Sequence, residues 1–275
     1  MPRRDLKDLR IVVTGASEGI GRAIAVDAAA RGMKVLATAR KQADLEALKA
    51  EVPGIEILSA DVTVPTDRAA MLQAMQDRFG GVDVLLNNAG IGATGHFMES
   101  EPESLRRIFE TNYFGPAELI RLFLPTLKVG RTPAVVNISS ILGRRGWPGR
   151  SLYCSSKFAI QGLSDALRAE LDRFGVSVLV VNPGLTQTNF SKNLLERKAR
   201  VQLDHLRGMS PQTVARRTLD ALAADAAEIS LTPRGLLLIA LNRWAPFLID
   251  RIGKRKVRRV FKDDILARYA EADRS

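Results

Sequence analysis

A glycine-rich turn between an apolar strand and a helix restricts the fold of this chain more than any other feature. An apolar run at 10–13 predicts a short buried strand, the turn at 14–21 follows at once, and a helical pattern begins after it. The turn carries Gly15, Gly19 and Gly21, which would let the backbone approach a pyrophosphate while the helix N-terminus supplies N–H groups. The segment therefore predicts a dinucleotide-binding site, and the simpler alternative is a glycine helix cap.

Further strand patterns alternate with helical ones along the chain. Short apolar runs predict strands at 34–39, 55–58, 82–86, 134–138, 177–181 and 228–231. Strands that alternate with helices form parallel sheets, because each crossover helix packs on a face of the sheet. The expected fold class is α/β: a single Rossmann-type doubly wound parallel sheet of about seven strands with helices on both faces, followed by a C-terminal helical extension.

The composition fits this size of fold. The chain has 275 residues, and 46% of them are hydrophobic, which suffices for a full core. Cys154 is the only cysteine, so we expect no disulfide, no metal site and a cytoplasmic location. No apolar signal core precedes the first strand and no run of about 18 apolar residues is present, so no transmembrane helix is expected.

The net charge of +11 is concentrated near the C-terminus. Between residues 243 and 262 there are eight Lys or Arg residues and one acid, Asp250. The remainder of the chain is only weakly basic. This pattern argues against a protein that coats nucleic acid, and no nucleic-acid partner is expected.

The end of the predicted strand at 34–39 indicates which dinucleotide would bind. An acid at this point holds the ribose 2′-hydroxyl of NAD, whereas an arginine accommodates the 2′-phosphate of NADP. Here Arg40 and Lys41 follow the strand and no acid does. We therefore expect NADP(H) to be preferred, with Arg40 as the phosphate clamp and Ser17 and Lys41 assisting. NAD(H) is the alternative, with the two basic residues simply exposed at a strand end.

A second group of residues carries proton chemistry. Tyr153 and Lys157 are four apart, so on a helix they share one face. A nearby ammonium stabilises a phenolate and lowers its pKa, so such a pair can exchange protons at neutral pH. Ser140 lies thirteen residues before Tyr153, at the end of the strand at 134–138, where its hydroxyl could bind a substrate oxygen.

These features together resemble the short-chain dehydrogenase/reductase family over roughly residues 8–232. The matching motifs occur in order: TGxxxGIG at 14–21, NNAG at 87–90, a mid-helix Asn112, Ser-x12-Tyr-x3-Lys at 140–157 and PGxxxT at 183–188. The resemblance implies the catalytic residues Asn112, Ser140, Tyr153 and Lys157. In the family, the asparagine distorts its helix and orders a water beside the lysine, which extends a proton relay to solvent.

The resemblance also implies a set of cofactor contacts. Asp61 and Val62 would lie at the adenine edge, and Thr188, with Thr186 on the same loop, would hold the nicotinamide amide. Asn87 is expected to be structural. Glu18 departs from the family's NADP-preferring members, which often carry a basic residue in the glycine turn. The expected cofactor-binding residues are Gly15, Ser17, Gly19, Ile20, Gly21, Arg40, Asp61, Val62, Asn88, Ala89, Gly90, Tyr153, Lys157, Pro183, Gly184, Thr186 and Thr188.

The expected function is an NADP(H)-dependent oxidoreductase that interconverts a secondary alcohol and a ketone or aldehyde. A catalytically silent NADP-binding sensor or scaffold on the same fold is the alternative, and an extended-branch epimerase or dehydratase fits the glycine spacing less well. The expected substrate is apolar, such as a lipid, steroid, retinoid or long-chain ketone. This follows from the residues placed at the pocket wall, which are Leu142, Trp147, Leu185, Phe190 and Leu194. Arg144 and Arg145 at the pocket mouth are read as a solvated turn or, less favoured, as a site for an acidic substrate.

The resemblance further implies self-association. In the family, the helices at about 102–127 and 152–174 commonly pair across a two-fold axis. A homodimer or homotetramer is therefore expected.

The C-terminal part departs from shorter family members. We divide the chain into an NADP-binding and catalytic Rossmann domain at 1–232 and a basic amphipathic helical extension at 233–275. A basic face opposite Ile249, Ile252 and Val257 is typical of an interfacial membrane anchor, which suggests peripheral membrane contact through 235–262. The alternative, slightly favoured, is that the apolar face packs on the protein's own body or on a partner subunit.

Overall fold

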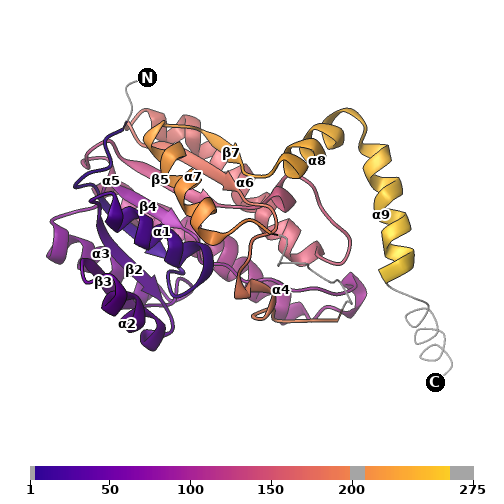
Figure 1. Cartoon of the computed structure of the whole chain (residues 1–275), viewed down its shortest axis with the longest axis horizontal. Helices are drawn as coiled ribbons and strands as arrows, with labels where there is room; N and C mark the ends of the chain where they lie inside the picture. The colour runs from indigo at the N-terminus through magenta and orange to yellow at the C-terminus, as the bar shows by residue number, and fades with distance from the viewer. Residues whose placement is uncertain (1–3, 199–207, 261–275) are drawn as a thin grey trace.

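The computed structural model describes residues 4–198 and 208–260 of the chain. Its centre is one parallel sheet in the order β3-β2-β1-β4-β5-β6-β7 (Figure 1). The seven strands are β1 (Arg10–Thr14), β2 (Lys34–Ala39), β3 (Ile55–Ser59), β4 (Val84–Asn87), β5 (Ala134–Ile138), β6 (Ser177–Asn182) and β7 (Glu228–Ser230). The predicted fold class is therefore confirmed, and strand boundaries differ from the prediction by at most two residues.

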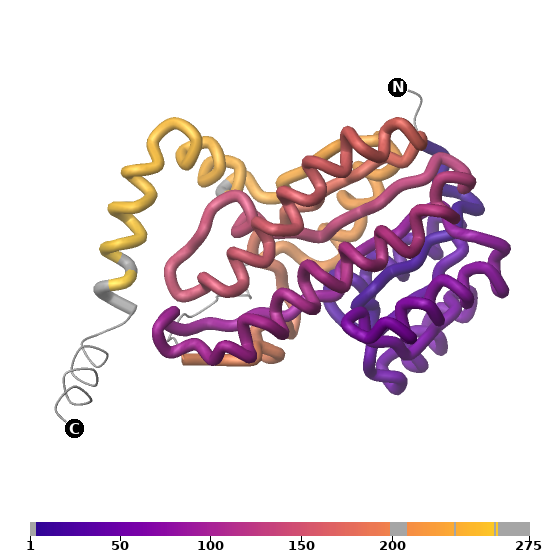
Figure 2. Tube along the Cα trace, turned by 180° about the vertical axis from the view of Figure 1, so that it is seen from behind, coloured from indigo at the N-terminus to yellow at the C-terminus, as the bar shows by residue number. Residues whose placement is uncertain are grey.

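Helices cover both faces of the sheet (Figures 1 and 2). Alternate residues of β1 point to opposite faces: Ile11 and Val13 join one buried cluster, and Val12 joins the other. The first cluster is completed by α1 (Gly19–Ala30), α2 (Gln42–Glu51) and α7 (Pro211–Ala223). The second is completed by α3 (Pro65–Phe79), α5 (Gly115–Leu127) and α6 (Ser151–Asp172).

The strand order places the carboxyl ends of β1, β4 and β5 side by side. The chain leaves β1 toward β2 on one side, and returns to β4 on the other. This reversal opens a crevice beyond the carboxyl ends of β1 and β4, which is where ligands bind in folds of this type. Three segments meet at this crevice: the glycine turn at 14–21, the segment at 87–90, and Ser140 after β5.

The predicted helix at 102–127 is interrupted. It consists of α4 (Pro102–Phe109), a π-helical turn η2 (Glu110–Phe114) and α5. Asn112 lies in the π-turn and is buried. The helix distortion implied by the family resemblance is therefore present.

Two helices extend beyond the sheet as an arm (Figures 1 and 2). They are α8 (Pro233–Trp244) and α9 (Pro246–Val260). On α9, Ile249 is buried and Gly253 faces Pro148, with Arg145 of the same loop paired to Asp250. The body-facing side of α9 therefore packs on the protein's own loop, whereas Ile252 of the predicted apolar face is exposed. Residues beyond 260 in the expected extension lie outside the described part.

The readings of Arg144 and Arg145 as a solvated turn or an acid-binding pair are wrong. Arg144 pairs with Glu228 of β7 and lies 3.5 Å from Asp165 of α6. Arg145 pairs with Asp250 and donates to the Asn242 side chain at 2.8 Å. Both arginines therefore tie the loop after β5 to distant segments, and neither lines the cavity at the crevice.

Neither a membrane span nor a metal cluster emerges from the described residues. Between residues 4 and 260, outside the gap at 199–207, no helix has both the length and the apolar character needed to cross a bilayer. The same residues contain no group of three or more His, Cys, Asp or Glu side chains arranged to hold a metal ion. Cys154 is buried, and its sulfur accepts from the Trp147 amide at 3.4 Å.

Candidate active site

A cavity of about 1240 Å³ occupies the crevice at the carboxyl ends of the strands. It runs from the glycine turn and Arg40 at one end to Leu142 and Trp147 at the other, with Tyr153 between them. All of the predicted cofactor-binding residues line it except Gly21. The five predicted pocket-wall residues line it as well.

The backbone of the glycine turn packs closely against the loop after β4. Gly15 has φ +66°, a left-handed conformation, and a Cβ there would lie 2.8 Å from the Cα of Ala89. A Cβ on Gly21 would lie 2.3 Å from Asn88 Nδ2 and from the carbonyl oxygen of Gly15. Gly21 therefore supports the site through close packing between helix and turn and does not line the cavity.

The two asparagines after β4 have different partners. Asn88 Nδ2 donates to the carbonyl oxygens of Thr14 at 2.9 Å and Gly15 at 3.0 Å, which fixes the turn against the neighbouring loop. Asn88 also lines the cavity. Asn87 Nδ2 donates to Asn137 Oδ1 at 2.9 Å inside the sheet, which agrees with the structural role expected for it.

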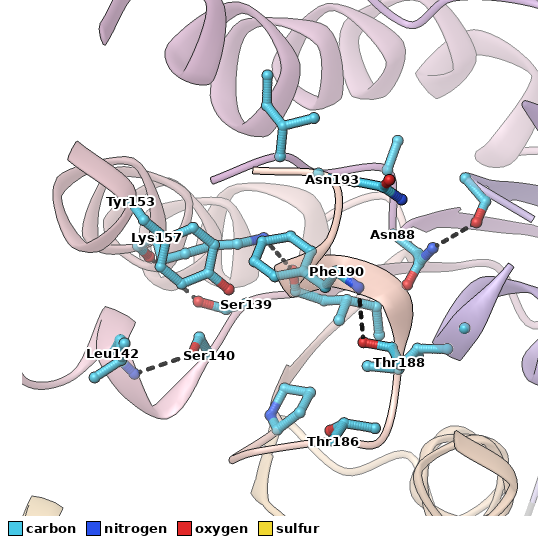
Figure 3. A pocket seen from close by; sticks show the side chains of 18 of the residues that line it. Asn88, Ser139, Ser140, Leu142, Tyr153, Lys157, Thr186, Thr188, Phe190 and Asn193 are labelled. Carbon is cyan, nitrogen blue, oxygen red and sulfur yellow. Dashed lines mark hydrogen bonds between the residues drawn. The ribbon is translucent and has the colours of Figure 1, made fainter. Parts of the chain in front are cut away.

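Ser140, Tyr153 and Lys157 gather at the middle of the cavity (Figure 3). Tyr153 and Lys157 project from the same helix, α6, and Ser140 lies opposite them after β5. Ser140 Oγ accepts from the Leu142 amide at 3.1 Å, which fixes the serine at the start of the loop after β5. The loop of Ser140 can approach α6 because Gly143 has no side chain. A Cβ there would lie 2.7 Å from the Lys157 carbonyl oxygen.

The charges at this point differ from the simple expectation. Burial raises the pKa of Tyr153, and this effect outweighs the lowering by the nearby Arg150 and Ser140 side chains. Lys157 Nζ lies 5.8 Å from the Tyr153 ring centroid and donates to the Ile138 carbonyl oxygen at 2.8 Å. Burial lowers the pKa of Lys157 to about 8. In this structure, therefore, the cation that most opposes the rise in the Tyr153 pKa is Arg150, which the sequence analysis missed.

Asn112 lies behind the site and does not line the cavity. Its Nδ2 donates to the Ile91 carbonyl oxygen and to Ser156 Oγ, both at 2.9 Å, and its Oδ1 accepts from the Ile91 amide at 2.9 Å. The π-turn is thus anchored to the loop after β4 and to α6. The proton relay through a water at this asparagine stays a prediction.

A short segment after β6 covers the cavity. Phe190 lies edge-on to the Tyr153 ring with centroids 5.5 Å apart (Figure 3). Asn189 and Asn193 both donate to the carboxylate of Glu18, which ties this segment to the glycine turn. Residues 199–207, which follow this segment, lie outside the described part.

Several cavity residues had no sequence signal of their own. Ser139 lines the cavity and donates to the Lys157 carbonyl oxygen at 3.2 Å. Gly235 and Leu238 of α8 also line it, although the sequence division assigned them to the extension. The position of Arg150, three residues before Tyr153, was the only clue to its place in the site.

The arrangement fits a nicotinamide dinucleotide. The glycine cradle has no room for side chains at Gly15 or Gly21, and the N-terminus of α1 follows it directly. Arg40 lies at the outer end, 65% exposed and 3.8 Å from Asp61. The predicted nicotinamide-binding loop with Thr186 and Thr188 also lines the cavity, and Phe190, just after it, packs on the Tyr153 ring.

The buried charge of Lys157 predicts a stability that depends on pH. The folded protein releases this proton near pH 8 and the unfolded chain near 10.5, so the free energy of unfolding should rise between these values. Lys157→Met should lack this rise. We would measure the free energy of unfolding in urea at pH 7.5 and at pH 10. Its increase between the two pH values should be about 1–3 kcal/mol larger for the wild type than for the variant. The exposed Lys128→Met is the control, and equal gains in wild type and Lys157→Met would contradict a buried ammonium.

Comparisons with known proteins agree with this geometry. Residues 10–199 match the family model described as short chain dehydrogenase. Dehydrogenase/reductase SDR family member 7B of Bos taurus is 34% identical over 272 residues, covering 94% of this chain and 84% of that relative.

Two solved structures show how similar folds are occupied. A short chain dehydrogenase/reductase of Burkholderia phymatum in complex with NAD aligns with a TM-score of 0.81 and 25% identity, covering 89% of this chain and 96% of that one. One of Burkholderia cenocepacia in complex with NADP aligns with a TM-score of 0.76 and 27% identity, covering 90% and 97%. This chain belongs to the short-chain dehydrogenase/reductase family and is an oxidoreductase that works with a nicotinamide cofactor.

Proposed function

We propose that the protein is an NADP(H)-dependent oxidoreductase that interconverts apolar secondary alcohols and ketones. The observation that carries this proposal is the meeting of Ser140, Tyr153 and Lys157 in one continuous cavity. One end of that cavity is a dinucleotide cradle, and the other is walled by apolar side chains. A reacting carbon placed beside Tyr153 would therefore face the nicotinamide-binding loop.

Each residue of the site has a distinct task in this reaction. The nicotinamide, when bound, supplies or accepts the hydride. Ser140 holds and polarises the substrate oxygen, and Tyr153 Oη donates its proton to that oxygen in reduction or accepts one in oxidation. Lys157 supplies positive charge close to Tyr153, and its position on the cavity wall suits the ribose of the cofactor. Phe190 and the segment after β6 keep bulk water from the reacting atoms.

The preference for NADP(H) is supported by the charges at the adenine end. Arg40 is exposed and the carboxylate of Asp61 is its nearest partner, so the guanidinium is accessible to a phosphate. The objection from Glu18 is weakened, because its carboxylate is engaged by two asparagine amides of the covering segment. NAD(H) is the alternative cofactor.

The apolar substrate is supported by the far end of the cavity. Its wall consists mainly of aliphatic and aromatic side chains, namely Ile141, Leu142, Trp147, Leu185, Phe190, Leu194, Leu195 and Leu238. Burying a methylene group against such a wall contributes about 0.8 kcal/mol. Longer substrates should therefore bind more tightly.

The exposed side of the arm supports contact with an anionic lipid surface. Trp244, Phe247 and Ile252 are 81%, 67% and 51% exposed, and Arg251 and Lys254 are exposed on the same helix pair. Apolar side chains among basic ones suit the boundary of an anionic bilayer. We propose a cytoplasmic protein that binds such a surface peripherally and takes apolar substrates from it.

Self-association is supported by exposed aromatic residues on the helices expected to pair. Phe114 of η2 and Phe158 of α6 are 47% and 45% exposed. We expect a homodimer or homotetramer in light scattering at micromolar concentration, and Phe158→Glu to shift it toward monomer. The exposed Val129→Glu should leave the assembly unchanged, whereas a wild type that is purely monomeric would contradict the proposal.

A matched series of methyl ketones tests the reaction and the substrate class. We expect kcat/KM with NADPH to rise roughly fourfold per methylene from butan-2-one to undecan-2-one, as burial of each methylene predicts. Rates with NADPH should exceed those with NADH, and Arg40→Ala should reduce this preference about tenfold or more. A clear NADH preference would contradict the cofactor assignment, and better rates on small sugars would contradict the apolar pocket.

Tight NADPH binding without turnover of any ketone or alcohol would favour the alternative function, a catalytically silent NADP-binding sensor.

Sedimentation with vesicles tests the lipid contact. Full-length protein should pellet at low salt with vesicles containing phosphatidylserine and much less with neutral vesicles. The double variant Trp244→Glu with Phe247→Glu should bind at least tenfold more weakly, because it removes apolar contact and adds repulsion. Val129→Glu, which changes an exposed apolar residue far from the arm, is the control. Equal retention of the wild type and the double variant in the supernatant would show that the arm is only structural.

A further inference from the structure

Arg150 is a buried guanidinium in the wall of the substrate end of the cavity. It immediately precedes α6 and is only 6% exposed. Its Cζ lies 4.9 Å from the centroid of the Tyr153 ring. It therefore lies next to the residue that handles the proton of the reacting oxygen.

The guanidinium has no anionic partner among the described residues. No hydrogen bond or ion pair there involves its side chain, and Nε is enclosed without any partner. The contrast with the preceding arginines is clear, because Arg144 pairs with Glu228 and Arg145 with Asp250. Burial lowers the pKa of Arg150, which reflects the cost of holding this charge away from water. A buried unpaired cation is expensive, so its presence calls for a compensating ligand.

The start of α6 adds to the positive potential at this point. The helix is 22 residues long, its N-cap makes no side-chain hydrogen bond and its first turn contains no acid. The N-terminal end of a helix favours anions. The uncapped helix end and the unpaired Arg150 thus favour the same kind of ligand at the same place.

We propose that Arg150 anchors a carboxylate of the substrate. On this view, the substrates are hydroxy- or oxo-carboxylates with an apolar chain, and the carboxylate lies one or two carbons from the reacting carbon. The inference rests on the proposed oxidoreductase function and refines its substrate class. Leu142, Trp147 and Phe190 receive the apolar remainder.

The spacing of the site sets the position of the carboxylate. The guanidinium lies over the Tyr153 ring, while the tyrosine hydroxyl contacts the reacting oxygen. A hydrogen bond from an arginine nitrogen to a carboxylate oxygen spans about 2.8 Å. In 2- or 3-hydroxy acids, the hydroxyl and carboxylate oxygens lie about 3–5 Å apart. Such a molecule can contact both groups, whereas an acid group at the far end of a long chain cannot.

Oxidation of a hydroxy acid and its neutral ester tests the proposal. With NADP, the wild type should show a higher kcat/KM for 3-hydroxyoctanoate than for methyl 3-hydroxyoctanoate. In Arg150→Leu, the ratio of the two constants should fall about 30- to 100-fold, and Arg150→Lys should retain part of it. An effect of Arg150 on Tyr153 alone would act on both substrates equally and cancel in the ratio. Arg216→Leu, which removes an exposed arginine of α7, is the control.

A binding measurement keeps the test independent of turnover. Calorimetry with the NADPH-bound wild type should show at least tenfold tighter binding of octanoate than of octanol. Arg150→Leu, once shown to be folded by circular dichroism and to bind NADPH, should lose this difference. An acid-to-ester ratio unchanged in Arg150→Leu, or equal affinities of the wild type for octanoate and octanol, would overturn the proposal. If octanoate binds through Arg150 but no alcohol or ketone is turned over, the anion site stands and the proposed reaction fails.

Discussion

The site depends on two hydrogen bonds that the Asn88 amide donates to the carbonyl oxygens of Thr14 and Gly15. They join the loops that leave β1 and β4, the adjacent strands at which the direction of the sheet connections reverses. The two loops are in close contact, because a Cβ on Gly15 or Gly21 would collide with its neighbours. The dinucleotide cradle is therefore fixed by backbone packing, and the chemistry is added by side chains from the neighbouring strands.

That chemistry comes at a cost in buried charge. Lys157 and Arg150 both lie close to the Tyr153 ring, and both are more than nine-tenths buried. Burial opposes ionisation of all three groups, since it lowers the pKa of each cation and raises that of the phenol. A bound cofactor and an anionic substrate would offset much of this cost. The free-energy cost of burying charge is thus concentrated at the site where a bound cofactor and substrate would reduce it. Groups with shifted pKa values commonly gather in active sites.

The sequence predicted those parts of the structure that depend on local patterns. Apolar runs of strand length located all seven strands, and the glycine turn located the cradle, because both signals act over a few residues. The interruption of the helix at Asn112 was expected from the family resemblance alone. The PGxxxT match likewise placed Thr188 on a loop that does line the cavity.

What the sequence could not show depends on pairs of residues far apart in the chain. Arg144 meets Glu228, 84 residues away, and Arg145 meets Asp250, 105 residues away, so neither could be recognised as part of an ion pair. Ile252 was expected on the packed face of α9, but it is exposed, because the helix turns Ile249 and Gly253 toward the loop at 145–148. The burial of Arg150 follows from the same loop and carries no local signal.

The central claim is that Tyr153 exchanges a proton with the substrate oxygen while hydride passes to or from the nicotinamide. The most direct test is the single-turnover reduction of undecan-2-one by the Tyr153→Phe variant with saturating NADPH. The loss of nicotinamide fluorescence reports the rate of the reaction. The account predicts a rate at least about 1000-fold below that of the wild type. The dissociation constant for NADPH should stay within about threefold, because the ring and its packing remain. A variant that reduces the ketone within tenfold of the wild-type rate would contradict the account.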